Sequence, residues 1–428
     1  MTQKQNSSVP AIIVCILLFG MISFVTNLAS PMGKVLESQF EVAEWMGKLG
    51  VFCNFIAYAI MGIPAGIILQ KKGYKFTALT AVGVGFIGVG IQTIAGLLEG
   101  NLAFGIYLLG AFVAGFSMCM LNIVVNPMLN KLAGGGNRGN QLVQVGGSFN
   151  SLMGTATIML TGLLLGDIAK AQISQIFPLM YTALAIFALA FVVVLFTKIP
   201  ENQAAEVKAE EKSQYGPMSF RHFVLGAVAI FIYVGVEVGI PNLLNDWLID
   251  PNAVALSTGV AGMVTGTYWL LMLVGRLLGA AVGAKVSAKA MLATVSVVGL
   301  GLVAGAIFLN PAILVKMPVF DGANGFTMAE VPINAALLVL CGLCTSVMWG
   351  GIFNLAVEGL GKYTEKGAGI FMAMVCGGGI LPLLQGVVVT ATKGNYLASY
   401  WVIAAGLLFL LYYALVGSKN VNKNIPTE

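Results

Sequence analysis

Apolar residues dominate this chain in long blocks, and short polar segments separate the blocks. About twelve blocks are each long enough to cross a hydrocarbon core, for which an α-helix needs about 20 residues. We expect membrane-spanning helices over residues 10–36, 47–70, 76–97, 102–130, 140–166, 174–198, 219–248, 257–284, 288–310, 333–361, 363–391 and 396–417. The pattern therefore predicts an all-α membrane protein with twelve transmembrane helices.

Charged residues are scarce, which excludes an ordinary soluble fold. They make up 9% of the 428 residues, and hydrophobic residues make up 58%. Soluble globular chains carry about 25% charged residues. The first block follows a short polar tail and lacks a small-residue cleavage pattern, so we expect a retained helix and not a signal peptide. The expected surroundings are the lipid bilayer, and the net charge of +5 gives no argument for a nucleic-acid partner.

Lysine and arginine residues predict the orientation, because they accumulate in cytoplasmic loops. With both termini in the cytoplasm, the cytoplasmic segments hold 17 of the 22 basic residues and the outer loops hold five. These five are Lys34, Lys48, Lys170, Lys316 and Lys393. The bias therefore predicts a multi-pass protein with cytoplasmic termini.

The most charged stretch, 199–220, divides the predicted helices into six and six. We expect an N-terminal six-helix bundle over 1–198, a cytoplasmic linker over 199–218 and a C-terminal six-helix bundle over 219–428. Glycine-bearing segments at 145–154 and 375–386 form a weak internal repeat. Two related halves around a central site are typical of secondary transporters.

Polar side chains recur at helical spacing in the first half, although burying each of them in hydrocarbon is expensive. They include Ser30 and five amides, namely Asn27, Asn122, Asn126, Gln144 and Asn150. An amide offers both donors and an acceptor, which suits a neutral ligand rich in hydroxyl groups. The alternative is that the amides join helices, at roughly 0.6 kcal/mol per contact. We favour the lining of a shared aqueous cavity.

One carboxylate, Glu237, is expected near the middle of the membrane, with Tyr233 one turn earlier. Burying a carboxylate there is costly unless it is paired, protonated or hydrated. Glu237 is therefore our candidate for a ligand contact, a proton carrier or a cation ligand, and a hinge-stabilising hydrogen bond is the alternative. Gly239 and Pro241 are expected to break the helix nearby.

Charged groups near the ends of the predicted helices are expected to be solvated or to form gates. Asp246 and Asp250 lie at the outer end of the seventh predicted helix, where we expect water to reach them. Arg276 and Glu358 lie toward cytoplasmic ends, where gate salt bridges are expected. The long outer loop 311–332 is expected to form a small cap.

Two tryptophans, Trp269 and Trp349, are expected in the middle of predicted helices, and Asn354 follows the second one. Most membrane tryptophans lie at the interfaces instead. An aromatic face packs well against the C–H face of a sugar ring. Helix packing explains these positions equally well, so both interpretations stay open.

Enzyme signatures are missing from the sequence. All six cysteines fall within predicted helices, and the pair Cys341 and Cys344 has no second pair, so packing is the favoured interpretation. The sequence has no cluster of histidine and cysteine with metal-ligand spacing and no P-loop. We therefore predict no catalytic residue, no metal and no cofactor, and a protein that is not an enzyme.

Several segments resemble one family when they are read in order. They are IPAGIILQKKGYK at 63–75, Asn126–Pro127, FNS at 149–151, YVGVEV at 233–238, Gly275–Arg276 and the stretch 349–386. The chain resembles the major facilitator superfamily, and within it the fucose–proton symporter family that includes bacterial fucose and glucose/galactose permeases. The resemblance implies the major facilitator fold, a sugar substrate, a monomer and the bacterial inner membrane.

The chain departs from the fucose permease pattern at three positions. The resemblance implies a proton-coupling Asp where Ser30 stands, a coupling Glu where Asn122 stands and a Gln where Gly147 stands. Glu237 stands where this family commonly carries Glu or Gln. We therefore assign coupling to Glu237, with H⁺ or Na⁺ as the ion, and the alternative is that Glu237 only binds the sugar.

The sequence thus predicts a secondary active transporter that moves a neutral mono- or disaccharide by alternating access. The predicted substrate-binding residues are Asn27, Ser30, Asn122, Asn126, Gln144, Asn150, Tyr233, Glu237, Trp269, Trp349 and Asn354. The alternatives are a facilitative sugar transporter and a major facilitator of another class, such as a drug exporter. A receptor or scaffold that transports nothing is a further alternative.

Overall fold

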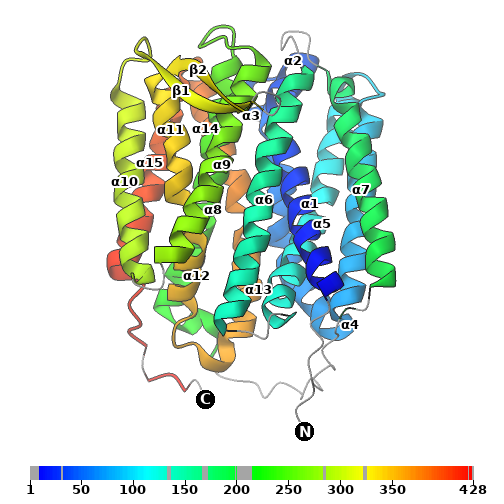
Figure 1. Ribbon diagram of the computed structural model, residues 1–428, viewed down its shortest axis with the longest axis vertical. Helices are drawn as coiled ribbons and strands as arrows, with labels where there is room; N and C mark the ends of the chain where they lie inside the picture. The colour runs from blue at the N-terminus through cyan, green and yellow to red at the C-terminus, as the bar shows by residue number, and fades with distance from the viewer. Residues whose placement is uncertain are drawn as a thin grey trace.

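The protein folds into a bundle of long helices that run along its longest axis (Figure 1). The computed structural model describes residues 9–29, 32–132, 136–165, 172–197, 199, 215–282, 286–321, 325–422 and 424–426. Within these residues, 12 segments are long and apolar enough to cross a membrane. The prediction of an all-α membrane protein with twelve transmembrane helices is therefore confirmed.

The first six crossings agree with the predicted spans to within a few residues. Their helices are α1 (Val9–Leu28), α2 (Met32–Phe40), α3 (Glu44–Gly47), α4 (Leu49–Ala95), α5 (Gly100–Leu132), α6 (Gly136–Leu165), η2 (Ile173–Ile176) and α7 (Phe177–Phe196). Helix α4 contains two crossings, because the chain turns inside it at Gly73, where φ is 82° and ψ is 176°. Glycine reaches such a positive φ without a steric penalty.

The last six crossings contain more interruptions than the first six. Their elements are η3 (Pro217–Ser219), α8 (Arg221–Ile249), α9 (Thr258–Val282), α10 (Ala288–Phe308), α11 (Ile333–Thr345), α12 (Met348–Val357), η4 (Gly361–Tyr363), α13 (Thr364–Met374), α14 (Gly377–Ala391), α15 (Tyr396–Tyr412) and η5 (Tyr413–Gly417). The tenth crossing is divided between α11 and α12, and the eleventh between α13 and α14.

Helix α8 passes through Pro241 without a break, so the predicted break at Gly239 and Pro241 is wrong. Proline lacks the N–H that bonds the carbonyl four residues earlier, which here is the carbonyl of Glu237. The Tyr268 hydroxyl of α9 donates to this carbonyl at 3.2 Å. A neighbouring helix therefore supplies the donor that Pro241 removes, as backbone groups in hydrocarbon require.

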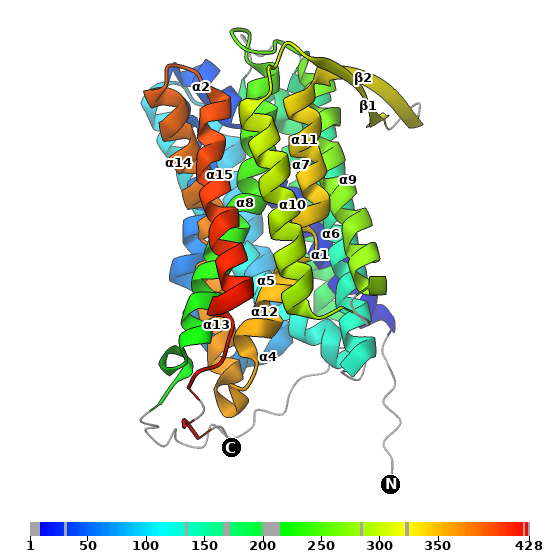
Figure 2. The same cartoon turned by 90° about the vertical axis from the view of Figure 1, so that its left-hand side faces the viewer.

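The loop that was expected to form a cap folds into an antiparallel hairpin of β1 (Leu314–Asp321) and β2 (Gly325–Pro332). Figure 2 shows the hairpin at the end of the bundle that lies opposite the start of α1. Met317, Val319 and Val331 are buried, whereas Lys316 and Pro318 are exposed. This alternation is typical of a strand with one covered face, and β1 rests on α9 and α11.

The first six crossings meet the last six mainly along two contacts, α6 with α9 and α4 with both parts of the eleventh crossing, α13 and α14. Glycines make the second contact close. A Cβ atom at Gly377 would collide with the carbonyl oxygen of Phe231 in α8, and one at Gly379 would lie 2.8 Å from Cα of Phe52 in α4. The start of α14 therefore touches a helix of each half, because small residues let backbones approach.

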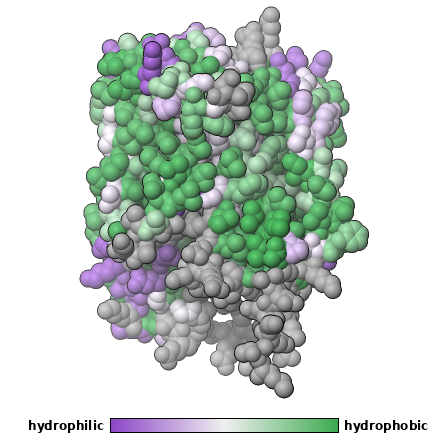
Figure 3. All heavy atoms as spheres, in the orientation of Figure 1, coloured by the Kyte–Doolittle hydropathy of each residue, from purple (hydrophilic) through white to green (hydrophobic). Residues whose placement is uncertain are grey.

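Large apolar side chains cover the outside of the bundle. Leu97, Phe196 and Phe308 expose 69%, 80% and 72% of their area. Figure 3 shows hydrophobic residues over the middle of one face and hydrophilic residues toward its upper and lower ends. Soluble proteins rarely expose contiguous apolar patches above a few hundred Å². The surface therefore suits contact with lipid chains.

Replacing Tyr268 with Phe is expected to destabilise the protein, because the Glu237 carbonyl loses its donor. The expected loss is about 1 kcal/mol, measured by thermal unfolding in detergent. Pro241→Ala restores the backbone N–H within α8, so Tyr268→Phe should cost less in that background. Equal losses in the two backgrounds would show that Tyr268 acts through another contact, such as its 2.9 Å hydrogen bond with Thr345.

Candidate functional site

Helices α6 and α9 lie side by side and bring polar and aromatic side chains of the second half against the first half. A Cβ atom at Gly154 of α6 would lie 3.4 Å from Trp269 Cδ2 of α9. Seven residues earlier on α6, a Cβ atom at Gly147 would lie 3.2 Å from Arg276 Nη1. Trp269 and Arg276 therefore both face α6.

Asn27 of α1 approaches the same glycine, Gly154, as Trp269 does. A Cβ atom at Gly154 would lie 3.1 Å from Asn27 Nδ2 and 3.0 Å from Ser23 Oγ. The Asn27 amide donates to the Ser23 carbonyl at 2.9 Å and to its hydroxyl at 3.0 Å. Trp269 Nε1 is buried and has no hydrogen-bond partner among the residues that the structure describes. Two predicted binding residues, one from each half, thus come together around Gly154.

Two further predicted amides follow one another on α5. Asn122 Nδ2 donates to the Tyr58 hydroxyl of α4 at 3.0 Å and to the Met118 carbonyl at 3.1 Å. Asn126 Nδ2 donates to the Asn122 carbonyl at 3.0 Å. Both amides are only partly buried. Tyr58 did not stand out in the sequence, because a tyrosine on an apolar helix is ordinary until its hydroxyl meets an amide.

Three predicted residues of the first half remain, namely Asn150, Gln144 and Ser30. Asn150 Nδ2 donates to the Phe19 carbonyl of α1 at 2.9 Å, so it joins α6 to α1. That bond corresponds to the helix-joining alternative considered for the amides. Gln144 lies on α6, and its side chain is outside the described part of the chain, as is the whole of Ser30.

Glu237 of α8 has a basic neighbour in its own half. Its Oε1 lies 3.7 Å from Arg276 Nη2, and the side chains expose 13% and 16% of their area. Arg276 Nη1 also donates to the carbonyl of Gly147 across the boundary between the halves. The sequence placed Arg276 near a helix end and did not pair it with Glu237. Opposite charges on two adjacent helices were the signal that could have suggested the pair.

Aromatic side chains of the second half form two pairs of rings. Tyr233 is fully buried, and its ring lies 6.2 Å from that of Trp349 in a T-shaped arrangement. The rings of Tyr268 and Trp269 lie 5.5 Å apart at 86°. Asn354, by contrast, is exposed on α12. The structure thus pairs Tyr233 with Trp349, places Trp269 against α6 and leaves Asn354 exposed.

A second group of charges lies at the hairpin end of the bundle. Asp246 is fully buried and forms an ion pair with the fully buried Lys48. Asp250 Oδ2 lies 3.4 Å from Lys34 Nζ. The prediction of a solvated Asp246 is therefore wrong. Position along α8 suggested access to water, but basic side chains of the first half cover this end of the helix.

Twelve crossings with polar side chains held between the first six and the last six define a membrane transporter of the secondary class. The chain belongs to the Major Facilitator Superfamily, whose sequence profile matches residues 11–381. This membership confirms the predicted family.

Two kinds of relatives span nearly the whole chain. The glucose/galactose transporter of Brucella abortus (strain 2308) is 29% identical over 425 residues, which are 98% of this chain and 97% of that protein. The L-fucose-proton symporter of Escherichia coli (strain K12) is 20% identical over 419 residues, which are 92% and 89% of the two chains. The resemblance to the fucose and glucose/galactose permeases is thereby confirmed.

Solved structures of the superfamily share the fold. The crystal structure of FucP in the outward conformation has a TM-score of 0.69 and 19% identity, and the match covers 97% of this chain and 100% of that chain. The D-xylose-proton symporter has a TM-score of 0.71 and 13% identity, with 96% and 98% covered. At these identities the likeness shows the fold alone.

Replacing Arg276 with Met is expected to lower the unfolding free energy by about 1–3 kcal/mol, because the partly buried Glu237 carboxylate is left without its partner. Thermal unfolding in detergent measures the loss. Glu237→Gln removes that charge, so the double variant should be more stable than the sum of the single losses allows. Strictly additive losses would show that the two side chains do not interact.

Proposed function

We propose that the protein moves a neutral mono- or disaccharide across a bacterial inner membrane by alternating access. One observation carries the proposal. Asn27 and Trp269, an amide and an aromatic ring from opposite halves, both lie against Gly154. An amide binds hydroxyl groups and a ring covers the apolar face of a sugar. The relatives named glucose/galactose transporter and L-fucose-proton symporter support the same substrate class.

The binding site is proposed to have an amide wall and an aromatic wall. The first half contributes Asn27, Ser30, Asn122, Asn126, Gln144 and Asn150. The second half contributes Tyr233, Glu237, Trp269, Trp349 and Asn354. Each half moves as one body, with residues 1–198 and 219–428 as the two bundles and 199–218 as the linker. Asn122 and Asn126 are only partly buried, which supports a role toward a ligand.

Cation coupling is proposed to run through Glu237, because Ser30 and Asn122 replace the acids that the fucose permease pattern carries. Arg276 is shared between Glu237 and the Gly147 carbonyl of the other half. When the halves separate at the cytoplasmic end, Arg276 loses its hydrogen bond to the Gly147 carbonyl and keeps only its ion pair with Glu237. That favours the ionised carboxylate, so a proton carried on Glu237 leaves to the cytoplasm.

The proposed orientation follows from the distribution of lysine and arginine. Both termini lie in the cytoplasm, since 17 of the 22 basic residues fall on that side. The protein acts as a monomer, is not an enzyme and needs no cofactor. H⁺ is the favoured ion and Na⁺ the second. A facilitative transporter is the second candidate function, and the missing acids at Ser30 and Asn122 favour it.

Counterflow in proteoliposomes with a panel of labelled hexoses and disaccharides tests the substrate class. We expect exchange of at least one sugar, and Asn122→Ala should weaken apparent affinity about tenfold through lost hydrogen bonds. Asn101→Ala, at an exposed position in the first turn of α5, is the matched control and should leave exchange unchanged. Exchange of no sugar would overturn the proposal and favour a major facilitator of another class.

Accumulation driven by an ion gradient tests the coupling. With a pH gradient, acid outside, we expect net sugar uptake in the parent protein. Glu237→Gln should abolish accumulation while counterflow continues, because exchange needs no change in protonation. Accumulation driven by a Na⁺ gradient instead would identify Na⁺ as the coupled ion. Exchange without accumulation in either gradient would identify a facilitator.

A further inference from the structure

Seven polar side chains gather at the hairpin end of the bundle, away from the site described above. The first half supplies two acids and two amines, and the second half supplies two acids and a phenol. They are Lys34, Glu37, Glu44, Lys48, Asp246, Asp250 and Tyr396. We name this group the outer network.

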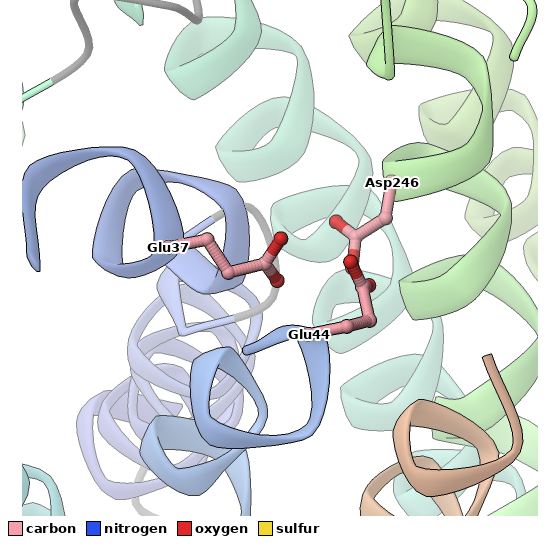
Figure 4. A group of neighbouring side chains, drawn as sticks. All are labelled: Glu37, Glu44 and Asp246. Atoms are coloured by element: carbon pink, nitrogen blue, oxygen red, sulfur yellow. The ribbon is translucent and has the colours of Figure 1, made fainter. Parts of the chain in front are cut away.

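Three of the acids form a cage of a size that suits a cation. Single carboxylate oxygens of Glu37, Glu44 and Asp246 lie within 4.8 Å of one another. Figure 4 shows these side chains converging from α2, α3 and α8. Asp246 is fully buried, and neither of its oxygens has a regular hydrogen bond among the described residues. A buried cage of carboxylates is costly unless a positive charge neutralises it.

The side chain of Lys48 supplies that charge. Its ammonium group is fully buried, pairs with Asp246 Oδ2 and lies 4.0 Å from Glu44 Oε1. Burial lowers the pKa of Lys48 to about 8, although Glu44 and Glu37 act to raise it. The amine is therefore mostly protonated at pH 7 and takes the place in the cage that a free cation would need.

Lys34, like Lys48, pairs with acids of both halves. Its Nζ lies 2.8 Å from Glu37 Oε2, 2.5 Å from Glu44 Oε2 and 3.4 Å from Asp250 Oδ2. The Tyr396 hydroxyl donates to Asp250 Oδ2 at 2.7 Å and also lies 3.0 Å from Glu44 Oε2. Lys34 and Tyr396 thus bring acids of both halves together.

The charges are divided unevenly between the halves. By formal charge the first half alone is balanced, because it contributes two lysines, Lys34 and Lys48, and two acids, Glu37 and Glu44. Asp246 and Asp250 of the second half have no basic partner within the outer network except these two lysines. Separating the halves at this end therefore strips both aspartates of their partners at once.

We propose that the outer network is an internal cation site that holds the outer face of the transporter closed. The tethered ammonium of Lys48 is its cation, and Asp246 is the ligand that leaves when the outer face opens. This assignment rests on the proposed orientation, with both termini in the cytoplasm. The backbones are close enough for such a seal, since a Cβ atom at Gly386 of α14 would lie 3.0 Å from Lys48 Cγ and 3.0 Å from Trp45 Cα.

The test measures access from outside to a residue beneath the network. Phe55 lies two helical turns inward from Lys48 on α4, is 5% exposed, and packs against Gly378 of α14. In intact cells, Phe55→Cys is treated with a membrane-impermeant maleimide, and mass spectrometry measures modification at position 55. No sugar is needed, so this experiment is independent of the substrate class.

We expect Asp246→Asn or Lys48→Ala to speed labelling of Phe55→Cys about tenfold or more, because breaking a buried ion pair is strongly unfavourable for the closed state. The exchange of charges in Lys48→Asp with Asp246→Lys should restore slow labelling. Millimolar ethylammonium should slow labelling in Lys48→Ala but not in Asp246→Asn, because only the first variant has an empty ammonium position. A collapsed fold would not show this selective rescue.

Exposed charges on the same face provide the control. Lys316 and Glu330 lie opposite each other in the hairpin, so Lys316→Ala and Glu330→Gln should leave labelling unchanged. Asn310→Cys, exposed at this end, reports the orientation. If it is labelled only in inside-out vesicles, the orientation is wrong and the same comparison is made there. Equal labelling of position 55 in the parent and in all network variants would overturn the proposal.

Discussion

Hydrocarbon offers no hydrogen-bond partners, so buried polar groups of this chain depend on partners that the chain itself supplies. Pro241 leaves the Glu237 carbonyl without its helical donor, and Tyr268 of α9 provides one. Asn150 donates to the α1 backbone at Phe19. Each of these bonds joins two different helices. Polar groups therefore help to determine which helices pack together, alongside the glycines that let backbones approach.

Much of the fold could be predicted from the sequence, because membrane thickness imposes a minimum length on every apolar block. The twelve crossings follow from that one constraint. Predictions that depended on a partner elsewhere in the chain were less successful. The helix through Pro241 needs Tyr268, and the burial of Asp246 needs Lys48. Neither partner is near in sequence, so local pattern gave no sign of them.

In the candidate site, too, some residues could be predicted from the sequence and others only from contacts in the structure. Asn27, Trp269 and Glu237 stood out because amides, mid-helix tryptophans and carboxylates are rare at membrane depth. The structure adds the residues that hold them in place, and these are ordinary by type. Gly154 is the point where Asn27 and Trp269 meet, and Arg276 is the neighbour of Glu237. Their importance comes from contact across helices, which a single sequence does not contain.

The two groups of charges differ in where their partners lie, and this difference bears on alternating access. Glu237 and Arg276 belong to the same half, so their pair can survive the separation of the halves. Lys48 and Asp246 belong to opposite halves, so their pair cannot. An equilibrium between two conformations shifts only through interactions that differ between them. The pair of Lys48 and Asp246 therefore changes the balance of conformations directly, whereas Glu237 changes it only through the bond of Arg276 to Gly147.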